Sequence, residues 1–115
     1  ISYNIDFVEE TNEYLLIRGW AWTNEMDLDF TDIRLWLFNE KQHILIHPYL
    51  ERRYDLPLDG AIQQNCGFFA IIPKAKCPQG IYKLGIEIQK RYIFPVKSSA
   101  RSIETNATVE LRKES

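Results

Sequence analysis

The sequence has no long hydrophobic run and no strong charge of either sign. None of its apolar runs approaches the ~20 residues that a helix needs to cross a bilayer, so this segment is predicted not to insert into a membrane. Its 115 residues carry 14 Lys and Arg against 16 Asp and Glu, a net charge of -2. Such a balance gives no basic field to attract a polyanion. Nucleic acid is therefore not an expected partner.

Cysteine and histidine are scarce, with two of each. A strand pattern follows Cys66 and separates it from Cys77 by ~20 Å or more, whereas a disulfide needs Cα atoms within about 7 Å. We therefore expect two free, buried thiols. The cysteines then do not indicate whether the protein works in an oxidising or a reducing compartment. His43 and His47 share one face of a predicted strand but lie ~13 Å apart. That is too far for both to bind one zinc ion.

The common catalytic motifs are missing as well. The sequence contains no nucleophile elbow, phosphate-binding loop or dinucleotide-binding fingerprint, and neither cysteine has a histidine near it in sequence. Paired carboxylates can hydrolyse glycosidic bonds, but a domain this small has no insertion to form a cleft. We expect a non-catalytic domain without a cofactor, and an enzyme acting on polysaccharide is the least favoured alternative.

Alternating apolar patterns are abundant, and the strongest is Tyr14–Trp22. Alternate residues of a strand point to opposite faces of its sheet. One face of this stretch is aliphatic or small, with Leu15, Ile17, Gly19 and Ala21. The other face carries Tyr14, Leu16, Arg18, Trp20 and Trp22. Residues 33–38 repeat the scheme, with Ile33, Leu35 and Leu37 opposite Arg34, Trp36 and Phe38. The aliphatic faces are predicted to form the core.

Six other segments show strand patterns: 1–8, 43–47, 67–72, 81–88, 92–94 and 103–111. Turn signals recur about every ten residues, and no segment has a convincing helical pattern. Together they predict one domain over residues 1–115, an all-β antiparallel sandwich of about seven to eight strands. Ile1, Tyr3, Ile5 and Phe7 are expected on one face, and the chain is expected to cross between sheets near residues 59–65. Because the sequence begins with Ile1 rather than Met, we expect a piece of a longer protein or a processed chain.

Five short motifs occur in order between residues 14 and 88. They are Ile17-Arg18-Gly19-Trp20-Ala21, the strand at 33–38, Arg53-Tyr54-Asp55-Leu56, Gly67-Phe68 and Pro78-Gln79-Gly80-Ile81-Tyr82-Lys83-Leu84. The set resembles small immunoglobulin-like domains of bacterial cell-envelope proteins associated with polysaccharides and glycosyltransferases. The resemblance implies an immunoglobulin-like sandwich with a non-catalytic accessory role. It also implies a place on the extracytoplasmic side of the envelope, with the cytoplasm as the alternative. A glycan or an adjacent domain of the same polypeptide is the implied partner.

The candidate ligand-binding residues come from the aromatic faces of the two strongest strands. If these strands pair, their outer side chains meet across one sheet: Arg18, Trp20, Trp22, Arg34 and Trp36. Indole rings stack on the C–H faces of sugars, and arginines hydrogen-bond hydroxyl groups, so a glycan platform is predicted. For the tryptophans themselves, the favoured interpretation is that they fill the core or cover a neighbouring domain. The domain would then be a structural spacer.

Two charged clusters have a structural and a functional interpretation. Arg52 and Arg53 together suit a carboxylate or phosphate, but the favoured interpretation is that Arg53 and Asp55 pin the crossing between the sheets through a salt bridge. Four acids lie before the second strong strand: Glu25, Asp27, Asp29 and Asp32. Their spacing lacks the glycine and the distal glutamate of a calcium-binding loop. A solvated acidic loop is therefore favoured over a calcium site.

Overall fold

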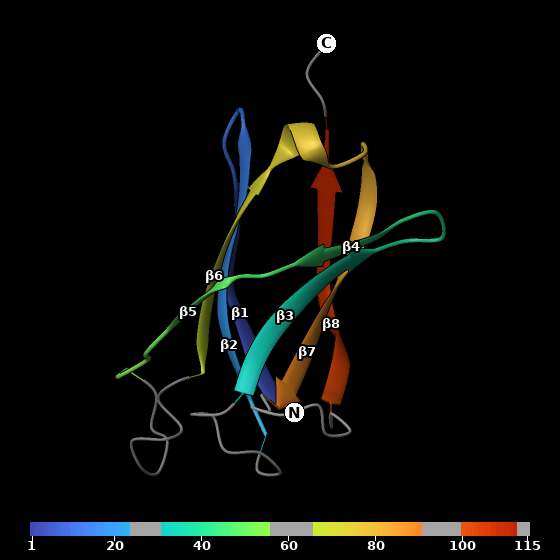
Figure 1. Ribbon diagram of the computed structural model, residues 1–115. Coiled ribbons are helices and arrows are strands. Elements are labelled where there is room, and N and C mark those ends of the chain that lie inside the picture. The colour runs from blue at the N-terminus through green and yellow to red at the C-terminus, as the bar shows by residue number, and fades with distance from the viewer. Residues whose placement is uncertain (24–30, 56–65, 91–99, 113–115) are drawn as a thin grey trace.

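The computed structural model describes residues 1–23, 31–55, 66–90 and 100–112, and within them eight strands form two antiparallel sheets (Figure 1). The first sheet contains β1 (Ser2–Glu10), β2 (Tyr14–Trp22), β6 (Gly67–Pro73) and β5 (Tyr49–Glu51), in the order β1-β2-β6-β5. The second contains β4 (His43–Ile46), β3 (Thr31–Phe38), β7 (Gly80–Lys90) and β8 (Ala100–Leu111), in the order β4-β3-β7-β8. The predicted all-β antiparallel sandwich is confirmed. One turn of 3₁₀ helix, Lys74–Lys76, follows β6.

The core lies between the sheets and is built from the aliphatic faces that the sequence predicts. Leu15, Ile17 and Ala21 of β2 are buried, and so are Ile33, Leu35 and Leu37 of β3. On β7 every second side chain from Tyr82 to Ile88 is buried in the same cluster. Burying one such aliphatic side chain contributes about 2 kcal/mol. The two facing sheets therefore hold together through the alternation along each strand.

Gly19 interrupts the aliphatic face of β2 because the chain leaves no space there. A Cβ at this position would collide with the carbonyl oxygen of Asn4 on β1 and would lie 2.8 Å from Cζ of Phe68 on β6. Phe68 is fully buried and fills the space that a side chain on β2 would otherwise take. The glycine therefore lets an aromatic ring of the next strand enter the core.

Tyr82 ties the turn before β7 to the core. Its ring is fully buried, and its hydroxyl donates a hydrogen bond of 2.7 Å to the backbone carbonyl of Pro78. Burial raises the pKa of this hydroxyl above its ordinary value. The phenol therefore stays protonated and remains a donor.

A bulge in β1 changes which way one predicted core residue points. Ile5 pairs with Gly19, but Phe7, and not Asp6, pairs with the next residue, Arg18. The extra residue at Asp6 moves Phe7 to the outer face, where its ring meets the edge of Phe69 with centroids 6.4 Å apart. The prediction that Phe7 shares a face with Ile5 is therefore wrong.

The crossing between sheets is also displaced from its predicted place at residues 59–65. β5 and β6 are hydrogen-bonded neighbours in one sheet, so the chain between them returns to the sheet that it left. The chain instead returns from the second sheet to the first at His47 and Pro48, which join β4 to β5. Proline suits this position because it has no N–H to donate to either ladder.

The element boundaries differ at a few points. β3 begins at Thr31, so Asp32 belongs to a strand and not to the predicted acidic loop. β8 begins at Ala100, three residues before the predicted strand at 103–111. The other three acids of that loop and the predicted strand at 92–94 lie outside the described residues.

Candidate functional site

The five predicted ligand-binding residues lie on opposite sides of the sandwich. β2 pairs with β1 and β6, whereas β3 pairs with β4 and β7, so the two strong strands belong to different sheets. Arg18, Trp20 and Trp22 lie on the outer face of the first sheet. Arg34 and Trp36 lie on the outer face of the second, with the core between the two groups. The single platform expected from strand pairing is therefore not formed.

All three tryptophans are half-buried, which places them neither in the core nor fully in solvent. Trp22 differs in the setting of its polar edge. Its indole N–H is buried, and within the described part of the chain it has no acceptor. A buried donor without an acceptor costs about 1–3 kcal/mol. The indole N–H of Trp22 is therefore not available to a ligand approaching this face.

A single arginine crosses the first outer face from β5 towards β1. Arg53, whose side chain is 8% exposed, donates two hydrogen bonds to Asp55, of 2.9 and 2.8 Å, and one of 2.6 Å to the carboxylate of Asp6. A longer contact of 3.5 Å reaches the carbonyl of Gly19 on β2. The hydrogen bonds from Arg53 lower the pKa of Asp55 to about 2. The predicted salt bridge between Arg53 and Asp55 is confirmed, but it braces one sheet and not a crossing.

Gly67 on β6 makes room for this arginine. A Cβ on Gly67 would lie 2.7 Å from Cγ of Arg53 and 2.7 Å from the carbonyl oxygen of Glu51. Glu51 in turn accepts a hydrogen bond of 2.8 Å from Nε of Arg18, one of the predicted ligand-binding residues. Arg18 is thus partly committed to a structural ion pair. Arg52, which follows Glu51 in the sequence, is exposed.

The rest of the first outer face is apolar and partly open. Tyr49, Ile71 and Tyr14 are 70%, 45% and 41% exposed, beside the half-buried pair of Phe7 and Phe69. Exposed apolar side chains gathered on one sheet suit contact with a partner surface. This face therefore fits the packing interpretation better than sugar binding.

The outer face of the second sheet carries a groove of about 300 Å³ beside Trp36. It is lined by residues of β3, β4, β7 and β8: Trp36, Phe38, His43, Gly85, Ile86, Glu87, Ser102, Ile103 and Glu104. Gly85 pairs with Trp36 on one side and with Glu104 on the other, so it occupies the middle of the groove. A Cβ there would lie 3.3 Å from Cε1 of Phe38. Because Gly85 has no side chain, the floor of the groove is backbone.

Aromatic and acidic side chains form the sides of this groove. The ring of Phe38 stacks on His43, with centroids 6.1 Å apart and planes 10° from parallel. Across the groove, Glu87 and Glu104 present carboxylates from β7 and β8. The groove therefore combines apolar ring faces with strong hydrogen-bond acceptors.

Each carboxylate of the groove already has a cation beside it. Arg34 Nη1 lies 3.8 Å from Glu87 Oε1, and Lys83 Nζ lies 3.1 Å from Glu104 Oε1. The local charge is therefore balanced, while the carboxylate oxygens keep lone pairs for further donors. Of the predicted residues, Trp36 lines the groove and Arg34 holds one of its acids. Phe38 was predicted on the same face as Trp36, but the remaining lining residues were missed because only the strand register brings them together.

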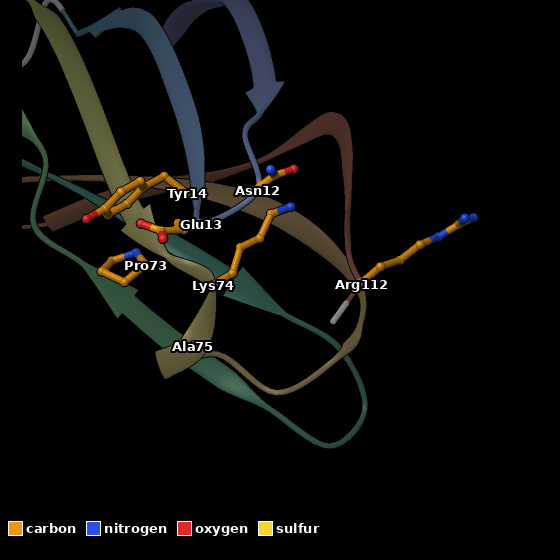
Figure 2. Close-up of a pocket in the computed structure, with 7 residues that line it drawn as sticks. All are labelled: Asn12, Glu13, Tyr14, Pro73, Lys74, Ala75 and Arg112. Carbon is orange, nitrogen blue, oxygen red and sulfur yellow. The ribbon is translucent and has the colours of Figure 1, made fainter. Parts of the chain in front are cut away.

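A third region is a hollow of about 530 Å³ at the end of the sandwich that holds the β1–β2 turn and the 3₁₀ turn (Figures 1 and 2). Its lining includes Lys74 and Arg112, and Figure 2 shows the Arg112 side chain directed away from the other lining residues. Lys74 is paired with Glu10 at 3.3 Å, and Arg112 with Glu110 at 2.7 Å. Because both cations are already paired, this hollow is a weaker candidate for binding an anion than its two basic residues suggest.

The two cysteines are buried and form no disulfide with each other; Cys66 directly precedes β6, and Cys77 follows the 3₁₀ turn after it. Burial raises the pKa of Cys66 to about 11, which is the opposite of what a reactive thiolate needs. In the described segments, no three His, Cys, Asp or Glu residues gather as metal ligands. No helix in those segments is long and apolar enough to cross a membrane.

The chain matches no protein-family model, no curated protein and no solved structure. The two outer faces of the sandwich differ in their chemistry. The first is apolar and braced by ion pairs, and the second has a groove with aromatic sides and balanced acids. The second face has the greater capacity to recognise a small polar ligand.

Proposed function

We propose that this domain is a non-catalytic accessory module that binds a glycan in the groove beside Trp36. The observation that carries the proposal is the placement of half-buried Trp36 and Phe38 around Gly85, with Glu87 and Glu104 facing the same space. The proposed ligand is a glycan, as the sequence predicts. Of the predicted residues, it keeps Trp36 as a contact and Arg34 as a positioning residue.

The chemistry of a sugar ring fits such a groove. Its C–H faces are apolar and electropositive, so they stack on the electron-rich faces of indole and phenyl rings. Its hydroxyl groups donate hydrogen bonds to carboxylates. Such hydrogen bonds to an ionised group are stronger than those between two neutral groups. Gly85 is itself buried, and its missing side chain lets the ring of Phe38 lie close to the backbone of β7. A flat polyhydroxylated ligand therefore meets the aromatic rings and the carboxylates that line the groove.

The setting of the domain is part of the proposal. The strand orders β1-β2-β6-β5 and β4-β3-β7-β8 match an immunoglobulin-like sandwich of sheets A-B-E-D and C′-C-F-G. The hydrogen bond from Tyr82 to Pro78 has the form of the tyrosine corner of that fold. Both observations support the resemblance to immunoglobulin-like domains of bacterial envelope proteins. The proposed location is extracytoplasmic, with the cytoplasm as the alternative.

A second candidate function is packing against a neighbouring domain, and the first outer face favours it. Tyr49 and Ile71 are 70% and 45% exposed, although both side chains are largely apolar. Covering them would remove apolar surface from water, which stabilises association. The domain would then serve as a spacer, and the first face, not the groove, would make the functional contact.

The test of the proposal is binding of soluble neutral polysaccharides, measured by isothermal titration and by affinity electrophoresis. Trp36→Ala is expected to abolish retention by any polysaccharide that retards the wild type. Trp20→Ala is the matched control, because it removes another half-buried indole from the opposite outer face. The proposal fails if no glucan, mannan, chitin or oligogalacturonate fragment binds. It also fails if Trp20→Ala loses binding while Trp36→Ala keeps it.

A further inference from the structure

We infer that the groove is one half of a longer binding surface, and that its ligand is a linear, uncharged oligosaccharide lying along β7 across Phe38. The inference rests on the proposed function and specifies the ligand of the same face. It is carried by a second hollow that shares a wall with the groove.

The second hollow has a volume of about 450 Å³ and lies on the same sheet. Its lining is Phe38, Asn39, Glu40, Ile81, Tyr82, Lys83 and Thr108. Phe38 lines both hollows, so its ring forms the ridge between them. Ile81 is 61% exposed and adds an apolar surface at the far end. Two hollows meeting at an aromatic ridge suit successive rings of one chain.

The length of the surface exceeds one sugar ring. The first hollow centres on Gly85 and the second reaches Ile81, four residues earlier on β7. At ~3.3 Å per residue these positions are ~13 Å apart. The pair of Lys83 and Glu104 links the two regions, because Lys83 lines the second hollow and Glu104 the first. A chain that follows β7 passes this ion pair, which offers it both a donor and an acceptor.

The charge balance of the surface favours an uncharged ligand. In the first hollow, Glu87 and Glu104 are neutralised by Arg34 and Lys83. An acidic glycan would place carboxylates beside Glu87 and Glu104, and it would have to draw Lys83 or Arg34 out of an ion pair. Like charges brought together in this way are disfavoured by several kcal/mol in a binding site. Neutral hydroxyl groups can use the spare lone pairs and leave the ion pairs intact.

The far end of the surface is held in shape before any ligand arrives. The side-chain oxygen of Asn39 accepts hydrogen bonds from the backbone of Lys41 and Gln42, at 2.9 and 2.8 Å. Its side-chain nitrogen donates to the carbonyl of Ile81 at 3.2 Å. The hairpin loop and the start of β7 are thereby tied together. Less conformational entropy is lost on binding when the contact surface is ordered beforehand.

The experiment is a titration of the full 115-residue chain with cello-, laminari- and chito-oligosaccharides from disaccharide to hexasaccharide, beside oligogalacturonates as charged counterparts. For the neutral series that binds, affinity is expected to rise about tenfold with chain length. Thr108→Arg fills the second hollow, so it is expected to remove this gain and leave the disaccharide affinity unchanged. Asn106→Arg is the control, since it adds the same side chain to β8 outside both linings.

The outcomes separate the inference from the proposed function. Affinity that does not change with chain length, or an equal gain in Thr108→Arg and wild type, overturns the extended surface while glycan binding stands. Tighter binding of oligogalacturonate than of every neutral series overturns the uncharged ligand. If no saccharide of any length binds, the proposed function fails and the inference fails with it.

Discussion

Arg53 and Asp6 are joined by a hydrogen bond of 2.6 Å, although one follows β5 and the other lies in β1, the two edge strands of the first sheet. The arginine passes over Gly67 of β6 and reaches the carbonyl of Gly19 on β2, so its side chain extends across the other three strands of that sheet. The bulge of β1 lies at Asp6, the residue that accepts this bond. One buried guanidinium thus fixes the width of the sheet.

Replacing Arg53 is therefore expected to destabilise the domain strongly. Arg53→Ala removes the cation from Asp6, whose side chain is only 22% exposed, whereas Asp55 is 63% exposed and is resolvated. Loss of the hydrogen bonds to Asp6 is expected to cost about 2 kcal/mol. Arg53→Lys keeps the charge but loses the two-pronged contact with Asp55, so its loss should be intermediate. Urea unfolding measures both changes in the free energy of unfolding. Equal stability of Arg53→Ala and wild type would refute the bracing role.

The lowered pKa of Asp55 implies that the stability of the domain depends on pH. This pKa is about 2 in the folded chain against 3.8 ordinarily, chiefly because Arg53 hydrogen-bonds the carboxylate. A pKa lowered on folding gives stability that is fully present above the unfolded pKa and is lost as the pH falls through the folded one. The free energy of unfolding should therefore fall between about pH 4 and pH 2. In Asp55→Asn this part of the profile should be flatter, and an unchanged slope would count against the pairing.

Alanine substitutions at Gly19 and Gly85 are expected to have different effects, on stability at the first position and on glycan binding at the second. In Gly19→Ala the new Cβ meets the backbone of β1 and the ring of Phe68, which are both fixed, so the variant should be severely destabilised or unfolded. In Gly85→Ala the nearest atom is Cε1 of Phe38 at 3.3 Å, and this ring is half-buried and can shift. Circular dichroism during heating compares their stability. Gly85→Ala should remain folded but bind glycan more weakly, because its groove floor is raised.

Tyr82→Phe tests the tie between the turn and the core. The variant keeps the buried ring but removes the hydrogen bond to Pro78, leaving that carbonyl without its donor. A loss of about 1–2 kcal/mol in the free energy of unfolding is expected. Tyr14→Phe, at an exposed ring, is the control and should change stability little. A similar loss in both variants would argue against a special role for Tyr82.

The pattern of alternation was enough to predict the buried faces of β2, β3 and β7, because that pattern depends only on the pleat of each strand. It did not show that β2 and β3 belong to different sheets, since consecutive strands of a sandwich either pair or cross over. It also did not reveal the bulge at Asp6. A bulge is an extra residue on one strand relative to its partner, so it is defined only once the two strands are paired. One extra residue therefore moved Phe7 to the outer face.

The groove was only partly predictable for a related reason. Trp36 stands out in the sequence as an aromatic residue on an outer face. Gly85 and Glu104 join it only through the registers of β3 with β7 and of β7 with β8. The second of these registers includes a bulge, between Lys83 and Gly85. Long-range register of this kind is set by the packing of the whole sandwich and not by any local pattern.

The most direct measurement of glycan binding is a nuclear magnetic resonance titration that follows the three indole N–H signals of the domain. Each tryptophan gives one signal, and Trp36→Phe, Trp20→Phe and Trp22→Phe assign them. Addition of the neutral oligosaccharide that binds best in calorimetry is expected to shift the Trp36 signal and leave those of Trp20 and Trp22 in place. Shifts of Trp20 and Trp22 with an unmoved Trp36 would contradict the proposed site.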